Sequence, residues 1–119
     1  MATTTIEERL AEYDRRHREL AAQIAEIGIV AAGSVTRRYT RCTSVGCRCN
    51  ADPPDPHGPY WQWTAKVNGK TVTKRLTDRE AQLYQEWIGN DRRIKTLLNQ
   101  IRKVDAKATE LMLKEAVSG

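Results

Sequence analysis

The sequence predicts an α+β protein in which an N-terminal helix, a small three-stranded antiparallel sheet and a long C-terminal helix follow one another. Three observations predict this order. Apolar residues recur at alternating spacings of four and three near both ends of the chain, which is typical of paired helices. The middle of the chain holds β-branched and aromatic runs around an Asn-Gly turn. All three cysteines and all four prolines also lie there. The length of 119 residues predicts a single domain over residues 1–119.

The first predicted element is a helix over residues 6–27. Thr5 and Glu8 have the spacing of a capping box, in which each side chain satisfies a free backbone N–H of the first turn. Gly28 stands where a left-handed C-terminal cap is expected. A heptad seam is formed by Ile6, Leu10, Tyr13, His17, Leu20, Ile24 and Ile27. We expect His17 to be a partly exposed seam residue rather than a metal ligand.

Residues 34–76 form the predicted Cys-rich β module. Val35–Arg41 is expected to be one strand. Tyr60–Val67 and Lys70–Leu76 are expected to form a hairpin, because Asn-Gly supplies the two positive φ angles of a type I′ turn. The four prolines predict that residues 50–59 form an ordered loop rather than a helix or a ladder strand.

The Asn-Gly turn also predicts which hairpin residues share a face. One face is mainly apolar and should pack on a helix; its cross-strand pairs are Val67 with Lys70, Ala65 with Val72, Trp63 with Lys74, and Trp61 with Leu76. The opposite face is polar and basic, and it holds Tyr60, Gln62, Thr64, Lys66, Thr71, Thr73 and Arg75. Sheets can read DNA by laying such a face into the major groove. An ordinary solvated sheet face has much the same composition and stays open as an alternative.

The last predicted element is a helix over residues 78–116, with a second capping box at Thr77 and Glu80. Its seam is formed by Leu83, Trp87, Asn90, Ile94, Leu97, Ile101, Val104, Ala108 and Leu111. A break or kink at Gly89–Asp91 is an alternative to one continuous helix. We expect the part after this point to pair with the first helix as a coiled-coil-like antiparallel hairpin. A second copy could cover the remaining seam in a four-helix bundle, so a homodimer through the helices is possible.

The strongest chemical signal is the spacing Cys42-x4-Cys47-x-Cys49-x7-His57. Three thiolates and an imidazole form a Cys3His set that suits tetrahedral Zn²⁺. The sequence therefore predicts a structural zinc site resembling a zinc knuckle. Because all four candidate ligands are used, no position is open for substrate and we expect no enzymatic activity. Cysteines without metal beside an unrelated His57, or thiol redox chemistry by Cys47 and Cys49, remain alternatives.

The charge distribution indicates the class of partner. The chain carries a net charge of +5, and residues 35–76 alone hold eight basic and two acidic side chains. Such a local positive field favours polyanions. We expect nucleic acid, DNA rather than RNA, with contacts from Arg37, Arg38, Gln62, Thr64, Lys66, Thr73, Lys74 and Arg75. The competing interpretation is a protein–protein interaction module that works through its helices.

Location is predicted from what the sequence lacks. No apolar run is long enough to span a bilayer, so no membrane partner is expected. Residues 1–5 have neither the basic nor the apolar region of a signal peptide. We therefore expect a cytoplasmic protein with reduced thiols.

Two resemblances follow from these motifs. The stretch Gly33–Leu98, with its Cys cluster, His57-Gly58-Pro59-Tyr60-Trp61 and Gly69-Lys70 hairpin, resembles a family of small uncharacterised bacterial and archaeal proteins. Thr43 follows the first Cys where that family commonly has Gly. The family has no established activity to carry over, and the resemblance supports the zinc site. Separately, Tyr60–Gln85 is similar to the three-stranded arm-binding domains of phage-type integrases, which lack the cysteine cluster.

Overall fold

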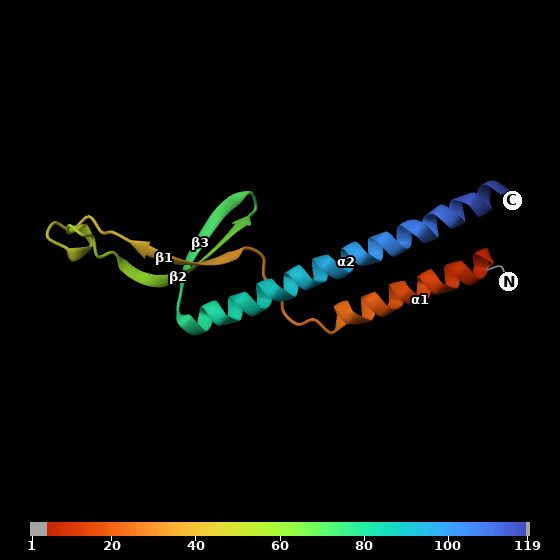
Figure 1. Ribbon diagram of the computed structural model, residues 1–119, viewed down its shortest axis with the longest axis horizontal. Coiled ribbons are helices and arrows are strands. Elements are labelled where there is room, and N and C mark those ends of the chain that lie inside the picture. Colours follow the sequence, from red (N-terminus) through yellow and green to blue (C-terminus); the bar gives the residue numbers. More distant parts are fainter. Residues whose placement is uncertain (1–4, 119) are drawn as a thin grey trace. The chain divides into compact units, whose positions relative to one another are not determined.

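The computed structural model describes residues 5–118. Its elements in chain order are α1 (Ile6–Ala25), β1 (Ser34–Thr40), the 3-10 helix η1 (Arg48–Asn50), β2 (His57–Val67), β3 (Lys70–Leu76) and α2 (Asp78–Ser118). The predicted α+β class is confirmed (Figure 1). The chain forms two compact units, one of residues up to 29 together with those from 90 onward, and one of residues 30–89. Within the described residues, neither helix combines the length and apolar character that a bilayer span requires.

Both helices begin as their capping residues predict. At α1 the Thr5 hydroxyl accepts the backbone N–H of Glu8 at 3.1 Å. At α2 the box is reciprocal, since the Thr77 hydroxyl accepts the Glu80 N–H at 3.2 Å and the Glu80 carboxylate accepts the Thr77 N–H at 3.0 Å. These contacts satisfy backbone donors that have no partner inside the helix, and so they set both starting points.

The end of α1 differs from the prediction. The helix stops at Ala25, and the backbone N–H groups of Glu26 and Ile27 bond carbonyls three residues earlier, at 3.3 and 3.1 Å. These tight bonds satisfy the last carbonyl groups before the chain reaches Gly28. Gly28 does not have a positive φ, so the predicted left-handed cap at that position is wrong.

The first unit is the predicted antiparallel helix pair. Figure 1 shows α1 beside the C-terminal part of α2. Leu20 of α1 and Leu97 and Ile101 of α2 form the buried cluster. The partly buried residues packed against it are Ala21, Ile24, Ile27 and Val104. The two predicted seams therefore meet in this pair.

Polar seam residues in the pair have specific partners. His17 Nδ1 lies 2.8 and 3.0 Å from the two carboxylate oxygens of Asp105, which agrees with its predicted place on the seam. Asn90 donates from Nδ2 to the Ile29 carbonyl at 2.8 Å. Because its side chain bonds the segment after α1, Asn90 does not cap a new helix, and α2 continues through residues 89–91.

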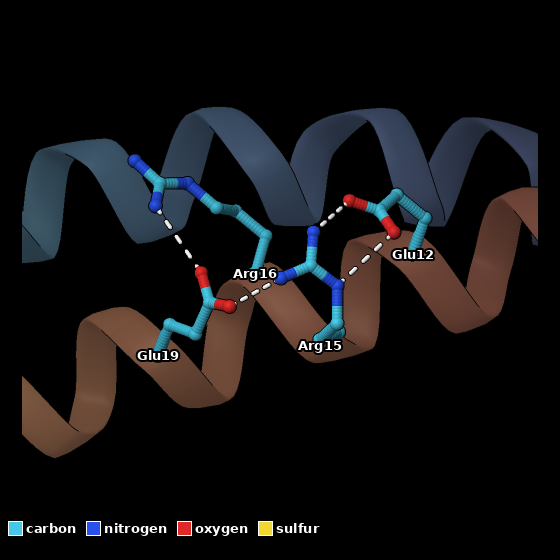
Figure 2. A network of polar contacts seen from close by, with 4 residues as sticks. All are labelled: Glu12, Arg15, Arg16 and Glu19. Carbon is cyan, nitrogen blue, oxygen red and sulfur yellow. Dashed lines mark hydrogen bonds and ion pairs between the residues drawn. The ribbon is translucent and has the colours of Figure 1, made fainter.

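The outer side of α1 is a solvated, charged surface. Figure 2 shows Arg15 between Glu12 and Glu19, with Arg16 also reaching Glu19. All four side chains are about half exposed, and such helical pairs contribute about 0.2–0.5 kcal/mol each. The hydrogen bond from Arg15 lowers the pKa of Glu12. This network therefore gives the helix modest support.

The second unit contains the sheet, in the order β1-β2-β3 with both pairings antiparallel. Every cross-strand pair predicted for the hairpin is confirmed, from Val67 opposite Lys70 to Trp61 opposite Leu76. Asn68 and Gly69 have φ angles of 52° and 79°, the positive values that the two-residue turn requires. The turn therefore fixes the face of each hairpin residue.

The strands β1 and β2 begin earlier than predicted. β1 covers Ser34–Thr40, and β2 already begins at His57, so the prediction that residues 57–59 stay outside the ladder is wrong. The register shifts between the Arg38–Tyr60 and Thr40–His57 pairs. Pro59 lies in this irregular step, where its missing N–H removes no required ladder bond. The strand can therefore extend across the proline.

The apolar face of the sheet packs on the start of α2, as predicted. The rings of Trp63 and Tyr84 lie 5.0 Å apart, and the Trp61 Nε1–H group donates to the Asp78 carboxylate at 3.0 Å. The buried apolar residues of this unit are Ala65, Leu76, Ala81 and Ile88, with Cys49 buried separately in the loop. One face of the sheet is thus occupied by the helix, and the residues of the other face are exposed or half-buried.

Candidate metal centre and open sheet face

The candidate ligands come from the end of one strand, a short 3-10 helix and the beginning of the next strand. Cys42 follows the end of β1, and His57 is the first residue of β2. Between them, Cys47 caps η1 and Cys49 lies inside it. One helical turn covers residues 48–50. The prediction that residues 50–59 form a loop without helix is therefore wrong at residue 50. This turn brings the sulfur atoms of Cys47 and Cys49, which are two positions apart in the chain, to within 3.3 Å of each other.

The backbone of this segment is held by its own hydrogen bonds. Gly46 has a φ of 82°, a left-handed conformation that favours glycine, as expected of a glycine at a tight turn. The N–H of Cys47 then bonds the Ser44 carbonyl at 3.3 Å, and the N–H of Asp55 bonds the Arg48 carbonyl at 3.1 Å. The Asn50 side chain donates to the Cys42 carbonyl at 2.7 Å. The ligands are therefore positioned by local backbone contacts.

The four donor atoms all lie within 4.8 Å of one another. Cys49 Sγ is 3.4 Å from Cys42 Sγ and 3.3 Å from Cys47 Sγ. His57 Nε2 is 3.2 Å from Cys47 Sγ and 3.4 Å from Cys42 Sγ. Zinc bonds of about 2.3 Å to sulfur and 2.0 Å to nitrogen separate tetrahedral donors by about 3.5–3.8 Å. These four distances lie within about 0.5 Å of the tetrahedral values, and no pair of donors exceeds 4.8 Å, so the residues present fit a tetrahedral metal.

The thiols differ in acidity because their surroundings differ. The hydrogen bond from His57, followed by those from the Ser44 backbone and the neighbouring thiols, lowers the pKa of Cys42 from 9.0 to about 6. The Cys42 backbone N–H favours the Cys49 thiolate, but burial and the neighbouring thiols outweigh it and raise the pKa of Cys49. A thiolate at neutral pH is the form that binds metal. Of Cys42 and Cys49, Cys42 is therefore the thiol that more readily forms the thiolate.

Nearby acidic groups do not join the cluster. Asp55 pairs with Arg48 at 3.3 Å, and both side chains are mostly exposed. The group of donors consists of the three thiols and one imidazole. A soft donor set of four protein ligands is typical of structural zinc sites rather than of calcium, magnesium or catalytic zinc.

The open face of the sheet is defined as the face opposite the Trp61 and Trp63 side chains. Cross-strand register and side-chain alternation place ten residues on it: Ser34, Thr36, Arg38, Tyr60, Gln62, Thr64, Lys66, Thr71, Thr73 and Arg75. All are exposed or half-buried. Three of them are cationic and none is acidic. Hydroxyl and amide groups fill most of the rest, so the surface can donate and accept hydrogen bonds.

Six of the eight residues expected to contact nucleic acid lie together on this face, namely Arg38, Gln62, Thr64, Lys66, Thr73 and Arg75. The other two lie on the opposite face. The Arg37 guanidinium stands 5.3 Å from the centre of the Trp61 ring. Lys74 is opposite Trp63 and lies 3.9 Å from the Glu80 carboxylate. Arg37 and Lys74 therefore do not share a surface with the other six.

Tyr60 is absent from the set of site residues predicted above, although it was placed on the polar face. In the structure the Arg75 guanidinium lies 4.3 Å from the centre of the Tyr60 ring, and Arg38 is the cross-strand partner of Tyr60. The hairpin register could have identified the contact with Arg75, because that residue is one step diagonal to Tyr60. The pairing with Arg38 required the register of β1, which no turn residue sets.

Comparison with known sequences identifies one family. The family described as a domain of unknown function (DUF6788) matches residues 10–85, more than half of the chain, including all four candidate ligands and the whole sheet. Searches of curated proteins and of solved structures gave no significant match. The chain therefore belongs to the family DUF6788.

Proposed function

We propose that this protein is a non-enzymatic, zinc-stabilised DNA-binding protein that contacts DNA through the open face of its sheet. The observation that carries this proposal is the composition of that face, with three cationic and no acidic side chains among ten. The other face is occupied by α2 through the Trp63–Tyr84 contact. A cationic, hydrogen-bonding sheet surface beside a covered one is typical of sheets that bind in a groove.

Zinc is the metal that best suits the Cys3His cluster. Three thiols and an imidazole within 4.8 Å match its preference for sulfur and nitrogen in a tetrahedron. Four protein donors leave no coordination position for substrate, which supports a structural role. In this role zinc would tie the end of β1 to the beginning of β2, because Cys42 and His57 lie at those two ends.

Groove geometry favours DNA over duplex RNA. The major groove of B-DNA is about 12 Å wide and admits β-strands, whereas the major groove of A-form RNA is deep and narrow. On the open face, Arg38, Lys66 and Arg75 are suited to phosphate oxygens. Gln62 and Thr64, on the central strand, are placed to reach base edges.

A salt series on a random-sequence duplex tests this function. Three phosphate contacts predict that the logarithm of the association constant falls with that of salt concentration with a slope of about −2.7. Replacing Lys66→Ala together with Arg75→Ala should weaken binding and reduce the slope by about 2. The matched control removes two exposed positive charges from α2, Lys103→Ala with Lys107→Ala. Equal losses in the two double variants would mean that overall charge, and not the open face, attracts the DNA.

A second candidate is protein–protein interaction through the helices. It is favoured by exposed apolar side chains near the C-terminal end of α2, with Met112, Leu113 and Val117 having 54%, 68% and 89% of their surface accessible. A second copy covering them would give a homodimer. Sedimentation equilibrium distinguishes the two: a dimer that Leu113→Ser with Val117→Ser converts to a monomer, without loss of DNA binding, would assign the helices to assembly.

A further inference from the structure

Three side chains on the open face form a cluster at the end of the sheet nearest the cysteines. Arg38 and Tyr60 are directly opposite each other on β1 and β2. The Arg75 guanidinium, from β3, lies over the Tyr60 ring at 4.3 Å from its centre. Among the described residues, neither arginine has a carboxylate partner, and both are exposed. We call these three residues the arginine–tyrosine cluster.

The chemistry of this cluster suits a phosphodiester. Two guanidinium groups can each present paired N–H donors to phosphate oxygens. The phenol between them adds a hydroxyl donor, and its ring holds one guanidinium by a cation–π contact. A nucleic-acid backbone supplies phosphates at a regular spacing along one strand, which fits residues that come from three adjacent strands.

Two of the candidate metal ligands lie close in sequence to residues of the arginine–tyrosine cluster. His57 begins β2 three residues before Tyr60, and Cys42 follows Arg38 by four residues. Only one cross-strand pair, Thr40 with His57, lies beyond the Arg38–Tyr60 pair, and the register shifts between the two pairs. A Cβ atom at Gly58 would lie 2.7 Å from the Arg38 carbonyl oxygen, so the backbones are in close contact there.

This arrangement makes the spacing of Arg38 and Tyr60 depend on the cluster of thiols. Cys42 Sγ lies 3.4 Å from Cys49 Sγ, and His57 Nε2 lies 3.2 Å from Cys47 Sγ and 3.4 Å from Cys42 Sγ. A cation held by these donors would be bonded to both Cys42 and His57. The ends of β1 and β2 are then tied together just beyond the irregular step in their ladder.

We propose that Arg38, Tyr60 and Arg75 form a phosphodiester site whose geometry is held by the metal, so that metal and nucleic acid bind cooperatively. This inference rests on the DNA-binding function proposed above. Coupling between two binding sites is reciprocal. Zinc therefore raises the affinity for DNA, and DNA raises the affinity for zinc by the same factor.

The test measures both directions on the full chain. Fluorescence anisotropy with a short, labelled, random-sequence duplex gives the DNA affinity of zinc-loaded and of chelator-treated protein. Zinc should raise this affinity by at least about fivefold, the lower end of usual coupling between sites. Competition with a chromophoric chelator then gives the zinc affinity with and without unlabelled duplex, and the two factors should agree.

A matched pair of variants separates the cluster from the rest of the face. Arg38→Ala and Lys66→Ala each remove one exposed positive charge from the open face, and Lys66 lies at the turn end, far along β2 from His57. Both should weaken DNA binding. Lys66→Ala should keep the full effect of zinc, whereas in Arg38→Ala the effect of zinc should fall toward none. Circular dichroism checks that both variants fold.

The outcomes separate the two proposals. If the zinc-loaded chain binds no duplex even at low salt, the proposed function is wrong. If it binds duplex equally with and without zinc, the function stands and the coupling is overturned. If Arg38→Ala and Lys66→Ala keep the same dependence on zinc, the metal acts on the sheet as a whole, and the assignment to this cluster is overturned.

Discussion

Removal of the metal should loosen residues 42–57 while the paired helices stay intact. A bound metal links Cys42 to His57, two residues that are 15 positions apart. Inside this segment, the amide groups of Ala51 and Asp55 both donate to the Arg48 carbonyl at 3.1 Å. Among residues 42–57, all of which the structure describes, Cys49 alone is buried, so little apolar packing supports these bonds. Their protection from solvent exchange therefore depends on the link.

The size of the effect follows from chain entropy. Closing a loop of 15 residues removes about 3 kcal/mol of conformational free energy from the open state at 25 °C. Without the link, local opening becomes easier by this amount, and exchange through that opening speeds up by roughly 150-fold. Because the metal would also bind Cys47 and Cys49, the expected increase in exchange rate is a lower limit.

The assay is amide hydrogen exchange followed by NMR, on zinc-loaded and chelator-treated protein. Ala51 and Asp55 report on the loop. Ala81, whose N–H bonds the Thr77 carbonyl at 2.9 Å in the first turn of α2, serves as an internal control. A second control is the variant Val45→Ser, because this fully exposed side chain lies in the same loop and does not contact the ligands.

A small change in exchange at these two amides would mean that the metal does not order the loop. If exchange at Ala51 and Asp55 changes by less than about threefold on metal removal, while the protein demonstrably loses its zinc, the metal does not hold the loop. The order of this segment would then come from its own hydrogen bonds and from the Arg48–Asp55 pair.

Three further predictions concern single residues. Leu20→Ala, which truncates a side chain only 1% exposed in the helix pair, should lower the free energy of unfolding by about 2–5 kcal/mol in urea denaturation; a smaller loss, or a change in zinc content, would argue against two separate cores. In metal-free protein, alkylation of Cys42 should follow a pKa of about 6, with buried Cys49 reacting last; reaction of both with an ordinary thiol pKa would contradict the assigned hydrogen bonds. Because the pKa of Cys42 is lowered, the stability its thiolate contributes is present at high pH and is lost as pH falls through about 6. Gly58→Ala should weaken zinc binding, since the new Cβ would meet the Arg38 carbonyl at 2.7 Å and φ is +122°; unchanged zinc affinity would show that the backbone yields at this step.

The parts of the fold that sequence could predict are those set by local rules. The Asn68–Gly69 turn defines the complete hairpin register, because a two-residue turn leaves no freedom in the pairing. Capping residues defined both helix starts. The seams of the helices followed from apolar spacing, and their meeting at Leu20 and Leu97 needed only antiparallel pairing.

The parts that sequence could not predict depend on contacts between distant segments. Pro59 argued against a strand, but it is tolerated at an irregular step whose position depends on the pairing with β1. The face of Arg37 depends on the same pairing. Lys74 is different: the predicted register already placed it opposite Trp63, so its assignment to the polar surface could have been avoided.

The candidate metal site was predictable in its residues but not in its construction. The spacing along the chain was sufficient to predict the candidate metal ligands Cys42, Cys47, Cys49 and His57. It did not indicate that a 3-10 turn would carry Cys49 or that His57 would begin a strand. Those two features connect the cluster to the sheet, and they follow from hydrogen bonds among residues 44–57 that no simple motif describes.

An NMR titration of the zinc-loaded chain with duplex DNA tests the proposed DNA-binding surface directly. We expect amide and side-chain signals to shift on the open face, at Arg38, Gln62, Thr64, Lys66, Thr73 and Arg75, while Trp61 and Trp63 on the covered face change little. Shifts confined to the helix pair, or no shifts at low salt, would contradict the claim that this sheet is a DNA-binding surface.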